Sequence, residues 1–392
     1  MTKTYARELH SGVKYVSRHE ATGYGIAARR NVAGLAKHGV PVTWTPVMSG
    51  RFWWQGHKIF DGTSVGVPEL DPLCNRRLDY DTVVVHAIPE FYPDWIRREK
   101  GKRILGCTVW ETDVIPDHWK GLLNSVHGLI VPCQWNKEVF EKCGVQVPVQ
   151  VVPYLFDERP LPDRVECHGI PQEDYVFYTI GEWSPRKTIW LTVRAFCEAF
   201  RADDKVTLVI KTNRHDHTQS FFHPFPRSTA QALEQVLRDY PNPPRIKLLS
   251  KLLSDDDMLR LHARGDCYVS LCRSEGWGMD AFDAARFGKP VIMTGYGGQL
   301  DFLPPELARL VRYRLIPAEA GIRWRSYTRD QQWADPDVSH AAQELRGVYE
   351  SRDKAAEQGR KLREFVLTRF QNSHSMEKLI AFLHGGGHSL NL

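Results

Sequence analysis

Short apolar runs alternate with segments of helical periodicity along the whole chain of 392 residues. Apolar runs typical of buried strands occur at 13–17, 41–47, 82–87, 103–110, 128–132 and 149–153 in the first half, and at 175–181, 206–211, 246–250, 267–272, 290–293 and 309–313 in the second. Strands that alternate with helices are typical of parallel sheets wound by right-handed crossovers. The pattern therefore predicts an α/β fold with two doubly wound, Rossmann-like sheets.

A stretch with three prolines and mixed charges separates the two halves, between Tyr154 and Asp174. Because a chain of this length exceeds one ordinary domain, we expect one domain over residues 1–160 and a second over residues 161–372. Doubly wound domains bind ligands at the carboxyl ends of their strands. We therefore expect the two domains to face each other across a ligand-binding cleft.

Three stretches interrupt the alternation: Arg51–Asp71, His215–Pro226 and Arg314–Gln332. The first contains Trp53-Trp54 and is expected to be a long loop, whose tryptophans either stack on a sugar or base or pack on their own domain. The second is expected to be an insertion. Its histidines favour a polar loop over a metal site, because no carboxylate or cysteine completes a regular ligand spacing. The third is expected to be irregular.

The stretch 274–292 carries the clearest chemistry. Glu275 opens a glycine-rich turn, and a helix is expected from near Met279 to Gly288, since glycine often ends a helix. Asp283 follows Glu275 by eight residues and falls on roughly the same helix face. Free amides and the helix dipole hold an anion, and carboxylates accept hydrogen bonds from hydroxyls. The combination predicts a site for a nucleotide-sugar.

Two other glycine-containing turns follow predicted strands. Gly181–Lys187 ends in Arg186 and Lys187. Basic residues are unfavourable at a helix start, so the pair indicates a phosphate nearby. Gly23-Tyr24-Gly25 precedes a helical segment that ends at His38-Gly39. The setting between strand and helix favours a ligand-binding role for Gly23 and Gly25 over a simple tight turn.

Together these segments resemble the family 4 retaining glycosyltransferases, which have the GT-B fold of two Rossmann-like domains. Glu275 and Asp283 match the family's glutamate–seven residues–glutamate motif, in which the first residue contacts the donor sugar and the second contacts the ribose. Asp283 is one methylene shorter than the family's glutamate. Lys187 matches the lysine that binds the diphosphate. The family's arginine directly after the glycine is replaced by Glu182, and Arg186 is expected to supply that charge.

Thr108–Asp113, Val131–Asn136 and Trp333–Asp337 resemble a subgroup with a VWETD strand and a VPxxWN turn. Many family members carry a histidine where this chain has Trp110-Glu111. Glu111, at the end of a predicted strand, is interpreted either as orienting an acceptor hydroxyl or as pairing with an arginine or lysine. The family pattern also implies that a C-terminal helix, within residues 373–392, returns to the first domain.

The resemblance implies a retaining glycosyltransferase that moves a sugar from a UDP- or GDP-sugar to an acceptor hydroxyl, in glycan or polysaccharide synthesis. It implies no metal and no cofactor besides the donor. The catalytic residues it implies are Glu275, Lys187, Arg186 and Glu111. The donor-binding residues it implies are Gly23, Gly25, Gly276, Trp277, Gly278, Met279 and Asp283.

Two alternatives stay open at this point. One is a DNA-modifying glycosyltransferase that acts on hydroxymethylated bases, in place of an acceptor such as a glycan or a lipid-linked sugar. The other is a nucleotide-sugar-binding regulator without catalysis, because Glu182, Asp283 and the missing histidine depart from the family pattern.

Composition bears on location and partners. The fractions of 42% hydrophobic and 25% charged residues, and the absence of a long apolar stretch or an apolar signal core, favour a soluble cytoplasmic protein. The eight dispersed cysteines favour reduced thiols. The net charge of +5 is concentrated before Gln150, where 19 basic residues face 15 acidic ones, against 33 and 32 in the remainder. The densest cluster, Arg97–Arg103, is either a solvated helix end or a contact for an anionic acceptor or the inner membrane face.

Overall fold

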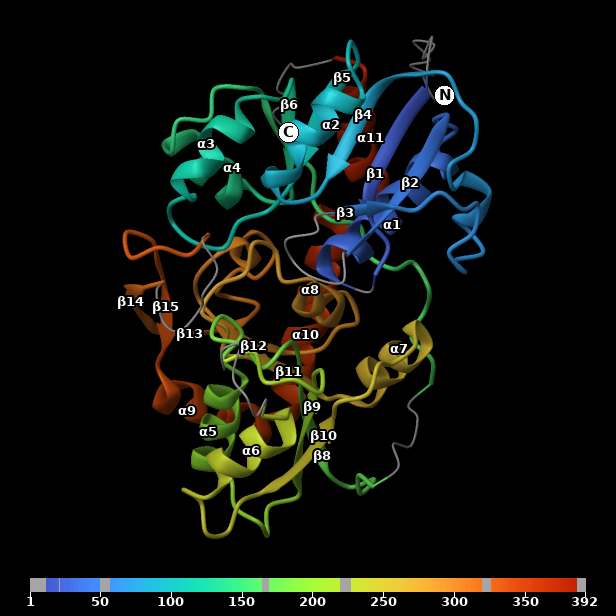
Figure 1. Ribbon diagram of the computed structural model, residues 1–392. Coiled ribbons are helices and arrows are strands. Elements are labelled where there is room, and N and C mark those ends of the chain that lie inside the picture. The colour runs from blue at the N-terminus through green and yellow to red at the C-terminus, as the bar shows by residue number, and fades with distance from the viewer. Residues whose placement is uncertain are drawn as a thin grey trace. The chain divides into compact units, whose positions relative to one another are not determined.

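The computed structural model describes residues 12–20, 22–49, 57–163, 169–218, 227–318 and 326–385. Its chain divides into two compact units (Figure 1). The first comprises Met1–Trp110, Ile115–Phe156 and Phe370–Leu392, and the second comprises Glu111–Val114 and Asp157–Arg369. Each unit has its own sheet.

The first unit is built on a seven-stranded sheet in the order β3-β2-β1-β4-β5-β6-β7. All neighbouring strands are parallel except β3, which runs antiparallel to β2 at the edge. Its strands are β1 (Gly12–Arg18), β2 (Val42–Ser49), β3 (His57–Ile59), β4 (Tyr80–His86), β5 (Arg103–Cys107), β6 (Gly128–Val131) and β7 (Val149–Val151). Its helices are α1 (Gly23–Lys37), α2 (Tyr92–Arg98), α3 (Asp117–Leu123), α4 (Gln134–Lys142) and α11 (Asn372–Leu383).

The first helix has clear start and stop signals. The hydroxyl of Thr22 accepts a hydrogen bond from the amide of Gly25 at 3.2 Å, as expected of an N-cap residue. The helix ends before His38, and Gly39 adopts a φ of +76°, which glycine tolerates. Its apolar face therefore starts and stops at fixed residues along β1 and β2.

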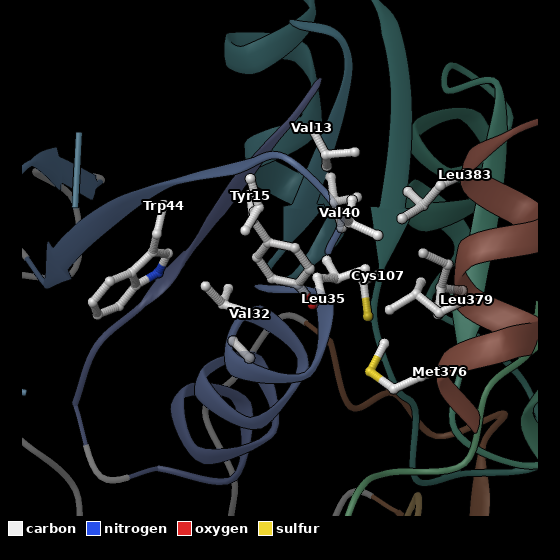
Figure 2. Close-up of a cluster of buried hydrophobic side chains, with 14 of the residues drawn as sticks. Val13, Tyr15, Val32, Leu35, Val40, Trp44, Cys107, Met376, Leu379 and Leu383 are labelled. Atoms are coloured by element: carbon white, nitrogen blue, oxygen red, sulfur yellow. The ribbon is translucent and has the colours of Figure 1, made fainter. Parts of the chain in front are cut away.

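The core of the first unit joins elements from both ends of the chain (Figure 2). Val32 and Leu35 of α1 lie in the same buried cluster as Met376, Leu379 and other apolar side chains of α11. Both Leu35 and Leu379 are fully buried. Burial of a leucine side chain contributes roughly 1.5–3 kcal/mol, so α11 is an integral part of this core.

The second unit is built on a six-stranded, all-parallel sheet in the order β10-β9-β8-β11-β12-β13. Its strands are β8 (Tyr175–Ile180), β9 (Val206–Lys211), β10 (Arg245–Leu249), β11 (Cys267–Ser270), β12 (Val291–Thr294) and β13 (Arg309–Val311). Its helices are α5 (Ile189–Ala199), α6 (Thr229–Leu237), α7 (Asp255–Arg264), α8 (Met279–Arg286), α9 (Val338–Glu350) and α10 (Arg352–Arg369). From β8 the strand order runs outward to β10 and then restarts at β11 on the other side, so the carboxyl ends of β8 and β11 form the switch point at which such sheets bind ligands.

Each predicted strand corresponds to a strand of the two sheets, and most bounds agree within two residues. Two of the differences have a clear structural form. The run 103–110 ends as a strand at Cys107. The run 309–313 is divided between β13 and β14 (Tyr313–Pro317), because the chain leaves the parallel sheet after Val311 and pairs antiparallel with β15 (Gln332–Pro336).

The expectation that Arg314–Gln332 is irregular is therefore wrong for its ends, which belong to the β14–β15 hairpin. Residues 313–317 are mostly exposed, so they lack the apolar pattern by which a buried strand is predicted. Trp53 and Trp54, and residues 219–226 of the expected insertion His215–Pro226, lie outside the described residues.

The composition favours neither membrane-spanning helices nor disulfides, and the described residues bear on each. No helix in the described part of the chain combines the length and apolar character needed to cross a membrane. No disulfide joins any two of the cysteines that the structure describes.

Most basic side chains of the cluster Arg97–Arg103 contact carboxylate or carbonyl groups of the first unit. Arg97 and Arg98 both pair with Asp94, at 2.6 and 3.4 Å. The ammonium group of Lys102 donates to the carbonyl of Tyr80 at 2.7 Å. Arg103 donates to two carbonyls at the end of α11. These contacts support the interpretation of the cluster as a helix end and turn.

Candidate functional site

Two loops meet at the switch point of the second sheet. The first, residues 181–188, follows β8, and the second, residues 271–278, follows β11. The amide of Arg273 donates to the carbonyl of Arg186 at 2.8 Å. The hydroxyl of Thr188, a residue with a left-handed φ of +40°, donates to the carbonyl of Leu271. These hydrogen bonds fix the two loops against each other.

Glu275 and the two basic residues of the first loop form an ion cluster. Lys187 Nζ contacts Glu275 Oε1. A guanidinium nitrogen of Arg186 lies 3.1 Å from Glu275 Oε2 and donates to the carbonyl of Ser274 at 2.8 Å. The Glu275 side chain is only 10% exposed. The structure thus brings together the three residues that the sequence indicated as the centre of the site.

The electrostatic balance of this cluster keeps all three groups charged. Burial alone raises the pKa of Glu275, but Lys187 and Arg186 outweigh it and hold the pKa of this carboxyl below its ordinary value. Burial lowers the pKa of Lys187 and of Arg186, and the carboxylate of Glu275 more than offsets it, so both pKa values are raised. Two cations and one carboxylate therefore lie together, shielded from solvent.

Glu111 belongs to the same cluster, although the sequence did not predict that its segment joins the second unit. It lies beyond the end of β5, in the short segment Glu111–Val114 that belongs to the second unit. Its Oε1 lies 3.8 Å from Arg186, and its Oε2 accepts from the hydroxyl of Tyr327 at 3.1 Å. Burial raises the pKa of the Glu111 carboxyl, an effect that Arg186 opposes and Glu275 reinforces. Of the two interpretations of Glu111, pairing with an arginine agrees with these contacts.

The segment that carries Glu111 is held to the base of the β14–β15 hairpin. The amide of Gln332 donates to Asp113 Oδ1 at 2.7 Å, and the amide of Asp113 lies 3.4 Å from the carbonyl of Gln332. This two-way contact, together with the bond between Tyr327 and Glu111, fixes the segment in the second unit.

A third loop, after β12, supports Glu275 from its main chain. The amide of Gly298 donates to the carbonyl of Glu275 at 2.8 Å. Gly297 has a φ of +110°, and a Cβ there would lie 2.7 Å from that carbonyl oxygen, so no larger residue fits. Ser274 Oγ and Gln299 Oε1 are buried next to Gly297, and no hydrogen-bond partner for either is found among the described residues.

The predicted donor-binding residues of the second unit lie on the turn before α8 and on that helix. Gly276, Trp277 and Gly278 are buried, and Gly278 takes a φ of +89° immediately before the helix begins at Met279. The side chain of Trp277 packs between aromatic rings, 5.0 Å from those of Phe282 and Phe302. Its contribution to a ligand site is therefore limited to its main chain.

The remaining predicted residues occupy two different places. Asp283 lies half-buried on α8, one turn beyond its start. Gly23 and Gly25 belong to the first unit, in the first turn of α1. A Cβ at Gly25 would lie 2.0 Å from the carbonyl of Glu20, so the close approach of that turn requires glycine there, whereas Gly23 faces open space.

Sequence reasoning missed Tyr327, Ser274, Gly297 and Gln299. A signal was present for one of them, because the pair Gly297-Gly298 follows the predicted strand 290–293 as a turn would. Nothing in the local sequence around Tyr327 connects it with Glu111, 216 residues away. In the described ranges, no group of three or more histidines, cysteines or carboxylates is arranged to hold a metal ion.

Comparisons with known proteins agree with this architecture. Residues 164–311 match the family model described as glycosyl transferases group 1. A comparison with curated proteins finds no match. Among solved structures, the chain is similar to the sucrose-phosphate synthase of Thermosynechococcus elongatus, with a TM-score of 0.69 and 14% identity over 96% of this chain and 99% of that one.

Two further solved structures resemble the chain. The Anabaena protein HepE, in complex with UDP and glucose, has a TM-score of 0.64 and 14% identity over 96% of this chain and 100% of that one. S. aureus TarM, in complex with UDP among other ligands, has a TM-score of 0.56 and 13% identity over 77% of this chain. The match spans only 55% of the TarM chain. The chain thus has the GT-B fold, and the match of its second unit to the group 1 glycosyl transferases supports its assignment as a glycosyltransferase.

Proposed function

We propose that the protein is a retaining glycosyltransferase that transfers a sugar from a UDP- or GDP-sugar to an acceptor hydroxyl. The observation that carries the proposal is the buried cluster of Arg186, Lys187 and Glu275 at the switch point of a parallel sheet. Cations for a diphosphate and a carboxylate for sugar hydroxyls are the groups that such a donor needs.

Arg186 and Lys187 are proposed to bind the diphosphate of the donor and to stabilise the charge that develops on it as the sugar leaves. The start of α8 follows the glycine turn directly and adds main-chain amides and the positive end of the helix dipole. In a site closed to water such fixed charges stabilise a departing anion strongly. No divalent ion is then required.

Glu275 is proposed to accept hydrogen bonds from the hydroxyls of the donor sugar, with the amides of Gly276, Trp277 and Gly278 beside it. Asp283 is proposed to accept from the ribose hydroxyls. The solved structures of HepE with UDP and glucose, and of TarM with UDP, support a uridine nucleotide as the first donor to test.

Transfer with retention needs no nucleophile from the protein. The acceptor oxygen bonds to the anomeric carbon on the face that the diphosphate leaves. The bond from that carbon to the phosphate oxygen breaks with its electron pair on the oxygen, which then takes the acceptor's proton. Arg186 and Lys187 stabilise the negative charge on the diphosphate during this step. The proposed acceptors are glycans or lipid-linked sugars, and the proposed role is glycan or polysaccharide synthesis.

The test begins with donor binding. A panel of UDP- and GDP-sugars is screened for thermal stabilisation of the purified protein, since a bound ligand raises stability by RT ln(1 + [L]/Kd). At least one nucleotide-sugar is expected to raise the Tm, and Glu275→Gln is expected to change the ranking among sugars on the same nucleotide. If no nucleotide-sugar at high concentration shifts the Tm, the proposal is wrong.

A second measurement separates an enzyme from a binding protein. Incubation with the stabilising donor in the absence of an acceptor is expected to release nucleoside diphosphate slowly, because water then replaces the acceptor. With an acceptor, the anomeric configuration of the product, measured by NMR, is expected to equal that of the donor. A donor that binds without any turnover would instead indicate a regulator.

A further inference from the structure

We propose that Glu111 is a positioning residue for Arg186, and that it gives up this arginine to the donor's diphosphate while its own carboxylate takes up one proton from solvent. The inference rests on the proposed function, because it takes Arg186 as a ligand of the diphosphate. It adds a residue pair, Glu111 with Tyr327, that acts on donor binding without touching the reacting atoms.

The geometry is that of one guanidinium shared by two carboxylates. One nitrogen of Arg186 lies 3.1 Å from Glu275 Oε2, and another lies 3.8 Å from Glu111 Oε1. The second oxygen of Glu111 is occupied by the hydroxyl of Tyr327 at 3.1 Å. The Glu111 side chain is 17% exposed, and that of Arg186 is 20% exposed. Arg186 is therefore held in a fixed orientation before any ligand arrives.

Arg186, Lys187, Glu275 and Glu111 carry two positive and two negative charges, and Asp280 in the first turn of α8 adds a further negative charge that acts on Lys187. The groups that face Glu111 are Arg186 and Lys187 from the loop after β8, Glu275 from the turn after β11, and Tyr327 from the segment before β15. Two cations therefore face two carboxylates. The diphosphate of a nucleotide-sugar brings two further negative charges. In a shielded site this excess is costly, and protonation of one carboxyl group reduces it.

Glu111 is the carboxyl group that accepts the proton most readily. Glu275 contacts both cations directly, and its pKa is lowered, whereas burial raises the pKa of Glu111, with Arg186 as its principal opposing charge. When Arg186 turns to the diphosphate, Glu111 loses that charge and its pKa rises further. Tyr327 suits both states, because a phenol hydroxyl donates to a carboxylate and accepts from a carboxylic acid.

Linkage fixes the sign of the pH dependence. The pKa of Glu111 is higher in the donor complex than in the free protein, so the donor binds the protonated form more tightly. Donor affinity is therefore greatest below the pKa of the free protein. It falls as the pH rises from that pKa to the pKa of the complex, by up to about tenfold per pH unit. Above both values it is constant again.

The experiment is isothermal titration calorimetry with UDP-glucose and GDP-mannose as probes, whose diphosphates do not titrate near neutral pH. Each titration is repeated in buffers of different ionisation enthalpy, from about pH 5.5 to about pH 8.5, which counts the protons taken up on binding. The wild type is expected to take up between about half a proton and one proton at its maximum. Glu111→Gln is expected to take up almost none and to bind with an affinity independent of pH. Tyr327→Phe is expected to keep the uptake with its maximum moved to higher pH, because the ionised carboxylate loses a donor.

A matched control is Glu344→Gln. Glu344 pairs with Arg309 at 3.1 Å and lies 3.5 Å from His340, in the same unit and at similar exposure, with no contact to the cluster. This variant is expected to show the wild-type uptake. Binding without proton uptake at every pH, or uptake that persists in Glu111→Gln, overturns the inference and leaves the proposed function intact. Failure of both probes and of the wider nucleotide-sugar panel to bind overturns the proposed function itself, and the inference with it.

Discussion

Lys187 and Glu275 are 88 residues apart in the sequence, yet the ammonium group of the first contacts a carboxylate oxygen of the second. Their contact follows from the strand order, because Lys187 follows β8, Glu275 follows β11, and these two strands are neighbours. The chain therefore brings a cation and an anion from distant segments together at the carboxyl ends of two neighbouring strands.

Glu275→Gln separates sugar recognition from diphosphate binding. The variant loses the carboxylate that is proposed to hold the sugar. The activation free energy of transfer is therefore expected to rise by about 2–4 kcal/mol. The affinity for free nucleoside diphosphate is expected to stay equal or to increase, because Lys187 and Arg186 lose a competing partner. Kinetics and calorimetry on the same preparation measure both. Transfer within threefold of the wild type would contradict the assignment of Glu275.

Arg186→Ala and Lys187→Ala test whether both cations act on one anion. Each substitution is expected to weaken nucleoside diphosphate binding by about 1.5–3 kcal/mol, the range for a charge-assisted hydrogen bond. The double variant is expected to lose clearly less than the sum, because neighbours on one ligand are coupled. Arg194→Ala, an exposed arginine on α5, serves as the control and is expected to bind normally. Full affinity in Lys187→Ala would refute its role.

Gly297→Ala tests the support of Glu275 from the loop after β12. The substitution introduces a Cβ at a φ of +110°, 2.7 Å from the Glu275 carbonyl, and is expected to cost about 1–3 kcal/mol and to slow transfer. Thermal unfolding and activity measure the two effects. Gly347→Ala is the matched control, because a Cβ there meets no other atom and the residue lies within α9. It is expected to keep or slightly raise the Tm, since alanine favours a helix over glycine.

Chelation tests the proposed independence from metal. Transfer is expected to continue in excess EDTA, because cationic side chains and helix amides occupy the role that a divalent ion would have. The assay compares initial rates after dialysis against EDTA with rates after addition of manganese or magnesium. Complete loss on chelation, restored by either ion, would contradict this part of the proposal.

Leu379→Ala tests the role of α11 in the core of the first unit. Removal of a fully buried leucine is expected to lower the free energy of unfolding by about 2–5 kcal/mol. Urea titration followed by tryptophan fluorescence measures it, because Trp44 lies in the same cluster. Lys378→Ala, an exposed neighbour on the helix, is expected to change stability little. Equal stability of the two variants would show that α11 contributes little to this core.

The fold could be predicted from the sequence because its sheets are parallel and buried. A strand such as Val206–Lys211 is apolar along almost its whole length, so it stands out from the flanking helices. Two of the strands that prediction missed have different surroundings. His57–Ile59 is a three-residue edge strand, and Tyr313–Pro317 is mostly exposed. Neither has a continuous apolar run, because neither is covered on both faces.

The candidate site could be predicted only as far as local motifs extend. Glu275 and Lys187 each stand in a strand–turn–helix segment with a recognisable pattern, and the structure brings them together. The contacts of Glu111 with Arg186 and Tyr327 depend on a four-residue piece of the first half joining the second unit. No local pattern specifies such a long-range pairing.

The position of α11 has a consequence for how the chain matures. Residues 370–385 are synthesised after the whole second unit, yet their apolar side chains complete the cluster that α1 and β1 begin. On the ribosome, the second sheet and its helices can acquire all their partners while the first sheet still exposes the surface that α11 will cover. Domains generally fold as units during synthesis, and exposed apolar surface promotes aggregation. The unit that is made first is therefore completed last, and its uncovered apolar surface favours aggregation until α11 has been synthesised.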